Sequence, residues 1–76
     1  MQYYKVPFDL ENFEDFLTSQ DIDNIARKYK VTVNQDEEFA TGTADQLANF
    51  FQALDGPAQS FPITEFLEYI QQFKLV

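Results

Sequence analysis

The sequence predicts a small α+β fold, in which helices cover a three-stranded, mainly antiparallel sheet. Short segments that alternate apolar and polar residues indicate strands, and longer segments with apolar residues at helical spacing indicate helices. At 76 residues the chain has the length of one domain, taken as residues 1–76, and its 45% hydrophobic content argues against disorder. The expected element order is β-α(α)-β-β-α-α.

The first strand is expected over residues 2–8. Tyr4, Val6 and Phe8 alternate there with polar or smaller residues, which is typical of a strand with one buried face. Pro7 has no backbone N–H, so it favours a sheet edge or the end of the strand.

One or two helices follow this strand. Asp9 is expected to cap the first, whose apolar positions are Leu10, Phe13, Phe16 and Leu17. Thr18 with Asp21, or Ser19 alone, caps a second, whose apolar positions are Ile22, Ile25, Ala26 and Tyr29. The sequence leaves open whether these are two helices or one kinked helix.

A β-hairpin is expected next. Its strands cover residues 30–34 and 37–41, and its polar turn covers residues 34–37. Val31 and Val33 share one face of the first strand, and Phe39 and Thr41 are matched to them on the second. Gly42 ends the second strand.

Two further helices complete the fold. Thr43 and Gln46 form a capping box before a helix that ends at residues 55–57, and its buried positions are Leu47, Phe50, Phe51 and Leu54. Ser60 and Pro62 start the last helix, whose apolar positions are Ile63, Phe66, Leu67, Ile70 and Phe73. The order resembles a split β-α-β ferredoxin-like layout with a helix in place of its final strand.

The residue types that common catalytic sites use are scarce. The chain has no His and no Cys, which removes the commonest general base, thiol nucleophiles, disulfides and thiolate metal sites. Ser19 and Ser60 stand where helix caps are expected, and Gly42 and Gly56 are too isolated to form a phosphate-binding loop. We therefore expect no enzyme, no catalytic residue and no cofactor.

Two acidic stretches invite comparison with metal sites. Asp21 and Asp23 begin like a calcium loop, but Ile25 and Ala26 stand where a polar ligand and a glycine are needed. The acids of residues 36–38 are adjacent, so an extended chain points them to opposite sides. Solvated charge is the simpler interpretation of both stretches, and no metal is predicted.

The charge of the chain is its most informative property. Thirteen acidic residues face five basic ones, giving a net charge of −8, and residues 6–26 and 31–73 contain no basic residue. Arg27, Lys28 and Lys30 lie at the end of an expected helix, where cations interact favourably with the helix dipole. Such a protein repels nucleic acid and anionic membrane and attracts basic surfaces.

The predicted interaction surface follows from this charge. On a helix, Glu11, Glu14 and Asp15 share one face, where like charges repel. The plain interpretation is the solvated face of an amphipathic helix. The functional interpretation is that carboxylates imitate the phosphates of a duplex and accept hydrogen bonds from Arg and Lys. The predicted partner-binding residues are Asp9, Glu11, Glu14, Asp15, Asp21, Asp23, Asp36, Glu37 and Glu38.

In size, acidity and lack of catalytic residues the chain resembles the small acidic inhibitors made by bacteriophages and mobile elements. We therefore expect a cytoplasmic, non-enzymatic protein that inhibits a basic, nucleic-acid-binding protein by DNA or RNA mimicry. No secretory signal or membrane-spanning stretch is visible in the sequence. An immunity protein against a basic toxin would use the same electrostatics. The alternative is an adaptor or a self-pairing subunit, such as a homodimer, whose exposed rings are Tyr3, Tyr4, Phe61, Tyr69 and Phe73.

Overall fold

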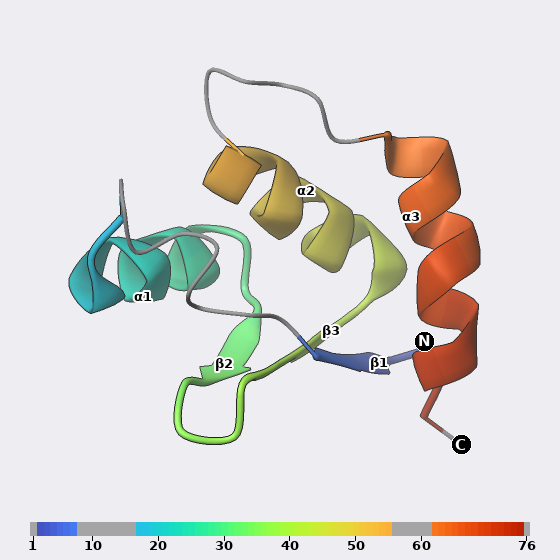
Figure 1. The fold of residues 1–76 in the computed structure, drawn as a ribbon, viewed down its shortest axis with the longest axis horizontal. Coiled ribbons are helices and arrows are strands. Elements are labelled where there is room, and N and C mark those ends of the chain that lie inside the picture. Colours follow the sequence, from blue (N-terminus) through green and yellow to red (C-terminus); the bar gives the residue numbers. More distant parts are fainter. Residues whose placement is uncertain (1, 8–16, 56–61, 76) are drawn as a thin grey trace.

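The computed structural model describes residues 2–7, 17–55 and 62–75. The elements in chain order are β1 (Tyr4–Pro7), α1 (Ser19–Lys28), β2 (Thr32–Asn34), β3 (Phe39–Gly42), α2 (Ala44–Asp55), α3 (Ile63–Ile70) and the 3₁₀ helix η3 (Gln71–Phe73). The strands form one antiparallel sheet in the order β1-β3-β2 (Figure 1). This is the predicted α+β fold. The helix expected after Asp9 lies outside the described residues, apart from Leu17.

Helix α1 begins with the capping box that the sequence predicts. The Thr18 hydroxyl accepts a hydrogen bond from the Asp21 N–H at 3.1 Å, and the Asp21 carboxylate accepts one from the Thr18 N–H at 3.0 Å. Ser19 is the first helical residue and not the cap, so that alternative is wrong. Because Thr18 has extended backbone angles, α1 does not continue a helix through Leu17.

The inner face of β3 differs from the prediction by one residue. Ala40 and Gly42 face the core, whereas Phe39 and Thr41 are half-buried on the other side of the sheet. The reason is the close approach of α2, which leaves room only for small side chains: a Cβ atom on Gly42 would lie 3.1 Å from the Gln46 Oε1.

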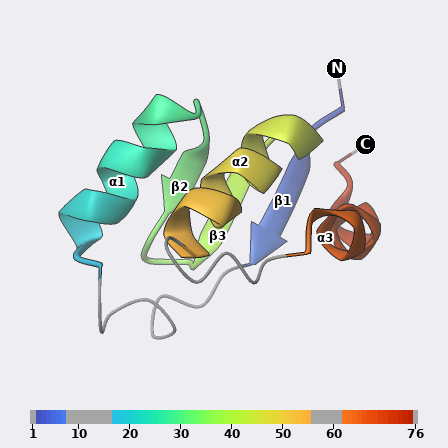
Figure 2. The same cartoon turned by 90° about the horizontal axis from the view of Figure 1, so that it is seen from above.

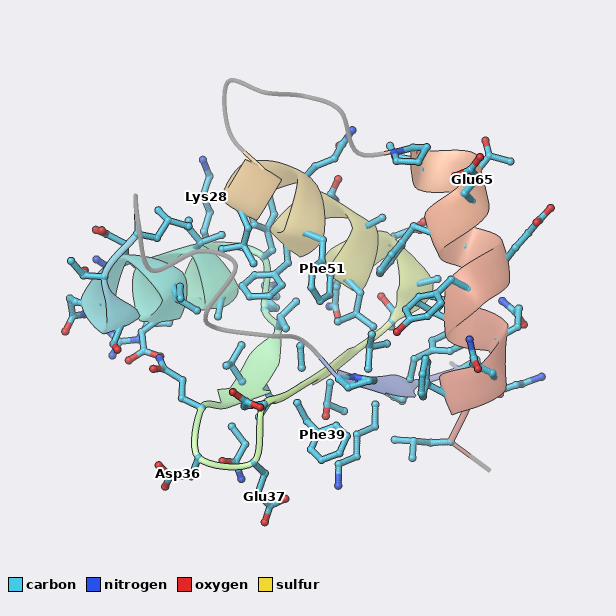
Figure 3. The ribbon with its side chains drawn as sticks, in the orientation of Figure 1. Lys28, Asp36, Glu37, Phe39, Phe51 and Glu65 are labelled. Atoms are coloured by element: carbon cyan, nitrogen blue, oxygen red, sulfur yellow. The ribbon has the colours of Figure 1, made fainter. Side chains whose placement is uncertain are left out.

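The ring of Phe39 lies on the face of the sheet opposite α2. Figure 3 shows Phe39 on this side, where the Lys5 Nζ lies 4.4 Å from its ring centroid. The strand also begins at Phe39, two residues later than expected, because Glu38 adopts a left-handed φ of 61° that ends the turn. The turn therefore holds one more acid than the sequence predicts.

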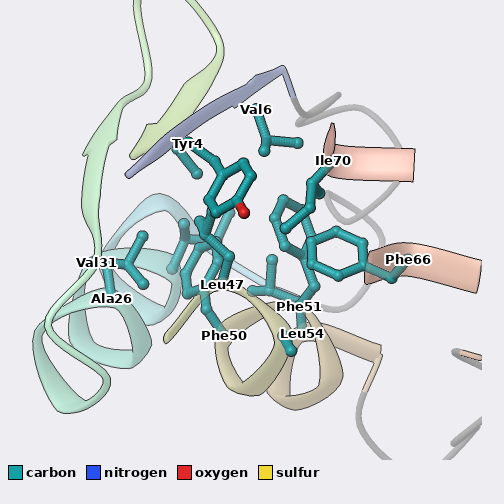
Figure 4. Close-up of a cluster of buried hydrophobic side chains, with 13 residues drawn as sticks. Tyr4, Val6, Ala26, Val31, Leu47, Phe50, Phe51, Leu54, Phe66 and Ile70 are labelled. Carbon is teal, nitrogen blue, oxygen red and sulfur yellow. The ribbon is translucent and has the colours of Figure 1, made fainter. Parts of the chain in front are cut away.

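The core lies between the sheet and the helices. Figure 2 shows α2 over the sheet, with α1 beside β2 and α3 beside β1. The predicted capping box of α2 is confirmed, since Thr43 N–H donates to Gln46 Oε1 at 3.1 Å and Gln46 N–H donates to Thr43 Oγ1 at 3.3 Å. All four predicted apolar positions of α2 are buried. The largest fully buried side chains, seen in Figure 4, are Phe50, Leu47, Leu54, Ile70 and Val6.

Helix α3 packs against the core by Phe66, Leu67 and Ile70, three of its predicted apolar positions. Phe66 and Ile70 are buried, whereas Ile63 is 39% exposed. Ile63 is the first residue of the helix, and Pro62 occupies the N-cap position before it. Ser60 lies outside the described residues. None of the helices in the described ranges has the length and hydrophobicity needed to cross a membrane.

Candidate functional site

The turn between β2 and β3 presents the most concentrated acidic group among the described residues. The Asn34 Oδ1 accepts a hydrogen bond from the Glu37 N–H at 3.1 Å, which orders the turn from within. Asp36, Glu37 and Glu38 are all exposed there. In Figure 3 the side chains of Asp36 and Glu37 point away from the body of the fold. Three carboxylates are thus held outward by one short, ordered segment.

A second acidic group lies beside this turn because of one glutamine. The Gln35 Nε2 donates to the Asp23 Oδ1 at 2.9 Å and to the Ser19 carbonyl at 3.2 Å, which brings the first turns of α1 against the hairpin. Asp23 and Asp36 line the same shallow hollow of about 480 Å³, although they are far apart in the sequence. The fold therefore joins two of the predicted acidic segments into one surface.

Asp21 holds its charge in a fixed position near the start of α1. The Thr18 backbone N–H, and then the Thr18 hydroxyl, hold the pKa of the Asp21 carboxyl below its ordinary value, because hydrogen bonds to the charged form favour it. Asp21 is exposed near the start of α1, where a negative charge interacts favourably with the helix dipole.

The basic residues of α1 lie at its other end. Arg27 and Lys28 occupy the last turn, and Arg27 lies about 9 Å along the axis from Asp21. Figure 2 shows that the start of α1 and the β2–β3 turn share one end of the fold. Among the described residues, no cation forms an ion pair with Asp36, Glu37 or Glu38. The carboxylates at this end of the fold (Figure 2), which we call the acidic end, are Asp21, Asp23, Asp36, Glu37 and Glu38.

The remaining predicted partner-binding residues, Asp9, Glu11, Glu14 and Asp15, lie outside the described residues. Sequence reasoning missed Gln35, which holds the acidic end together. Nothing in a single glutamine of a polar turn marks it for this role, because both of its partners are in a different element. Among the described residues, no group of three or more acidic side chains is arranged to hold a metal ion.

A separate, apolar hollow lies between β1 and α3. It has a volume of about 280 Å³ and is lined by Val6, Pro7, Phe51, Pro62, Glu65, Phe66 and Tyr69. Of the rings expected to be exposed, Tyr3 and Tyr69 are 47% and 45% exposed. Tyr4 is 7% exposed, so its predicted exposure is wrong: it faces the core as an inward residue of β1. Phe73 is half-buried, and Phe61 lies outside the described residues.

The acidic end offers carboxylate oxygens at ordered positions, which accept charge-assisted hydrogen bonds from Lys and Arg. No family model, no curated protein and no solved structure matches the chain. The functional argument therefore rests on the surface that the described residues form.

Proposed function

We propose that this protein is a cytoplasmic, non-enzymatic inhibitor that occupies the basic surface of a nucleic-acid-binding protein by mimicry of DNA or RNA. The observation that carries the proposal is the acidic end: Asp36 and Glu37 project from an ordered turn, and Gln35 ties Asp23 to the same surface. This acidic surface suits two classes of protein: inhibitors from bacteriophages or mobile elements, and immunity proteins against basic toxins.

The electrostatics of the chain favour such a partner. A nucleic-acid strand presents one phosphate per about 3.4 Å of duplex, and a groove that binds it is lined by Lys and Arg. Exposed carboxylates on an ordered turn offer the same groove negative charge without a flexible backbone to order. The net charge of −8 also steers encounters with a basic protein and repels nucleic acid itself.

Displacement from DNA–cellulose tests the proposal. Nucleic-acid-binding proteins from a cell lysate are loaded on the resin at low salt and then washed with this protein. We expect selective elution of one protein or a few, identified by mass spectrometry, beyond what the same low-salt buffer removes on its own. Direct binding of an eluted protein to this chain, measured without DNA, should weaken as salt rises, because ion contacts are screened. A wash that elutes nothing at low salt would contradict mimicry.

Two double variants make the test specific. Asp36→Lys with Glu37→Lys reverses the acidic end, whereas Glu65→Lys with Glu68→Lys makes the same change in net charge on exposed positions of α3. We expect the first pair to abolish elution and the second to preserve most of it. Equal loss in both variants would mean that net charge, and not the acidic end, is responsible.

A second candidate function is supported by the apolar hollow beside α3. Its lining rings, with the exposed Tyr69, form a surface through which an adaptor or a self-pairing subunit can associate. Salt separates the two candidates, since an apolar interface is maintained or strengthened where a mimic is released. Tyr69→Ser should then weaken association in high salt, and Asp36→Lys should not.

A further inference from the structure

We infer that the partner contributes an extended, Lys- and Arg-bearing segment, which pairs with the outer edge of β2 as an added strand. This inference rests on the proposed function and names the shape of the basic surface that the acidic end receives. It starts from the two edges of the sheet. In the order β1-β3-β2, both β1 and β2 are edge strands.

The two edges differ in what covers them. The outer edge of β1 meets the C-terminal segment, since the Leu75 N–H donates to the Tyr3 carbonyl at 2.9 Å and Tyr4 forms a bridge with Lys74. The outer edge of β2 pairs with no strand among the described residues. Thr32–Asn34 contains neither a charge nor a proline to block an added strand, and α1 lies beside this short strand with a hollow between them (Figure 2).

The register shows which backbone groups of β2 point outward. Backbone groups of successive residues in a strand alternate between its two neighbours. The Tyr3 carbonyl points away from β3. The backbone N–H and C=O of Val6, three residues later, therefore point toward β3, where Val6 is paired with Ala40. The backbone groups of Ala40 therefore point to β1 and not to β2. Val33 is the partner of Ala40 in the β2–β3 pairing, so its own N–H and C=O point to the open edge of β2.

The hollow at this edge has the chemistry that a basic strand requires. Residues 32–36 form one wall, and Ser19 and Asp23 of α1 form the other. The Asp23 and Asp36 carboxylates therefore border the open groups of Val33. Alternate side chains of an added strand lie about 6.6 Å apart on one side, so Lys or Arg two residues apart can reach separate carboxylates.

This arrangement divides the recognition between backbone and side chains. The open N–H and C=O groups of Val33 supply hydrogen bonds that any extended chain can make, and the carboxylates select a basic one. An acidic strand is rejected by repulsion, which gives the site its specificity. A helical basic segment can satisfy the carboxylates but cannot pair with Val33.

A pair of synthetic peptides tests the strand pairing. The first is a short, capped peptide that alternates Val or Thr with Lys or Arg, and the second has the same sequence with N-methyl groups on alternate backbone nitrogens. Their charges are equal, but only the first can donate all its backbone hydrogen bonds. We expect the first to shift the Val33 amide resonance and slow its hydrogen exchange, and the second to bind at least about tenfold more weakly. Asp23→Asn with Asp36→Asn should weaken the first peptide to a similar degree.

The outcomes separate this inference from the proposed function. Equal binding of both peptides, or binding that leaves the Val33 amide unaffected, overturns strand pairing. If the protein nevertheless displaces a partner from DNA–cellulose, mimicry stands without the added strand. If it displaces nothing but prefers the unmethylated peptide, the strand-pairing site stands and mimicry is overturned.

Discussion

Gln35 joins two segments that the sequence separates: its Nε2 donates to the Asp23 Oδ1 at 2.9 Å. The same nitrogen donates to the Ser19 carbonyl at 3.2 Å, so one side chain connects the β2–β3 turn with the start of α1. Gln35 is half-buried, which shields these bonds in part from competing water. The geometry of the acidic end therefore depends on a neutral residue that carries none of its charge.

Removal of this side chain should loosen the acidic end. Gln35→Ala loses two hydrogen bonds, one to a charged group, and we expect the free energy of unfolding to fall by about 1–2 kcal/mol. Urea unfolding followed by circular dichroism measures the change. Gln52→Ala, at an exposed position of α2, is the control and should have little effect or stabilise slightly, because Ala is the best helix former. Equal stability of Gln35→Ala and the wild type would show that the bridge contributes nothing.

The elements predicted correctly are those whose signals are local. The Thr43–Gln46 capping box and the apolar spacing from Leu47 to Leu54 specify α2 within one stretch of chain, and the structure confirms both. The face of β3 was predicted wrongly because a large ring at Phe39 suggests the core. The packing of α2 places the small side chain of Ala40 on the inner face instead, and the residues around β3 do not indicate that contact.

The candidate site likewise has a part that the local sequence predicts and a part that depends on contacts between distant segments. The sequence identifies Asp36 and its neighbours as an exposed acidic turn, because polar residues between two strand patterns indicate a turn. It does not reveal that Asp23 lies against that turn, since this contact depends on Gln35 and on the path of α1 beside β2. The open edge of β2 is likewise a property of strand order, which three short strands leave undetermined in sequence.

A second prediction concerns the C-terminal end of α1. The Val31 N–H donates to the Ala26 carbonyl at 2.8 Å and the Lys30 N–H donates to the Arg27 carbonyl at 3.3 Å, which together form a Schellman motif. Lys30 has a φ of 60°, a left-handed conformation that glycine adopts at lower cost than any residue with a Cβ atom. We expect Lys30→Gly to raise the free energy of unfolding by about 0.5–1 kcal/mol, which is the left-handed strain relieved less the extra conformational entropy that glycine loses on folding.

Lys28→Gly is the matched control for that substitution. It removes the same side chain two residues earlier, inside α1, where glycine lowers stability by about 0.5–1 kcal/mol. Thermal unfolding of the two variants should therefore shift in opposite directions from the wild type. A loss of stability in both would show that Lys30 does not end the helix in the left-handed conformation.

The third prediction concerns acid pH and the capping box of α1. The Thr18 N–H and hydroxyl lower the pKa of Asp21 from its ordinary value of 3.8. Because the folded state has the lower pKa, this carboxylate stabilises the fold fully above the unfolded-state pKa, and the contribution is lost as pH falls through the folded-state pKa. Thr18→Ala keeps the backbone N–H, which is the larger cause, and removes the hydroxyl. We therefore expect NMR titration of the Asp21 carboxyl carbon to show a partial rise of its pKa toward 3.8. Ser19→Ala should leave the titration unchanged, and an equal rise in that variant would contradict Thr18 as the cap.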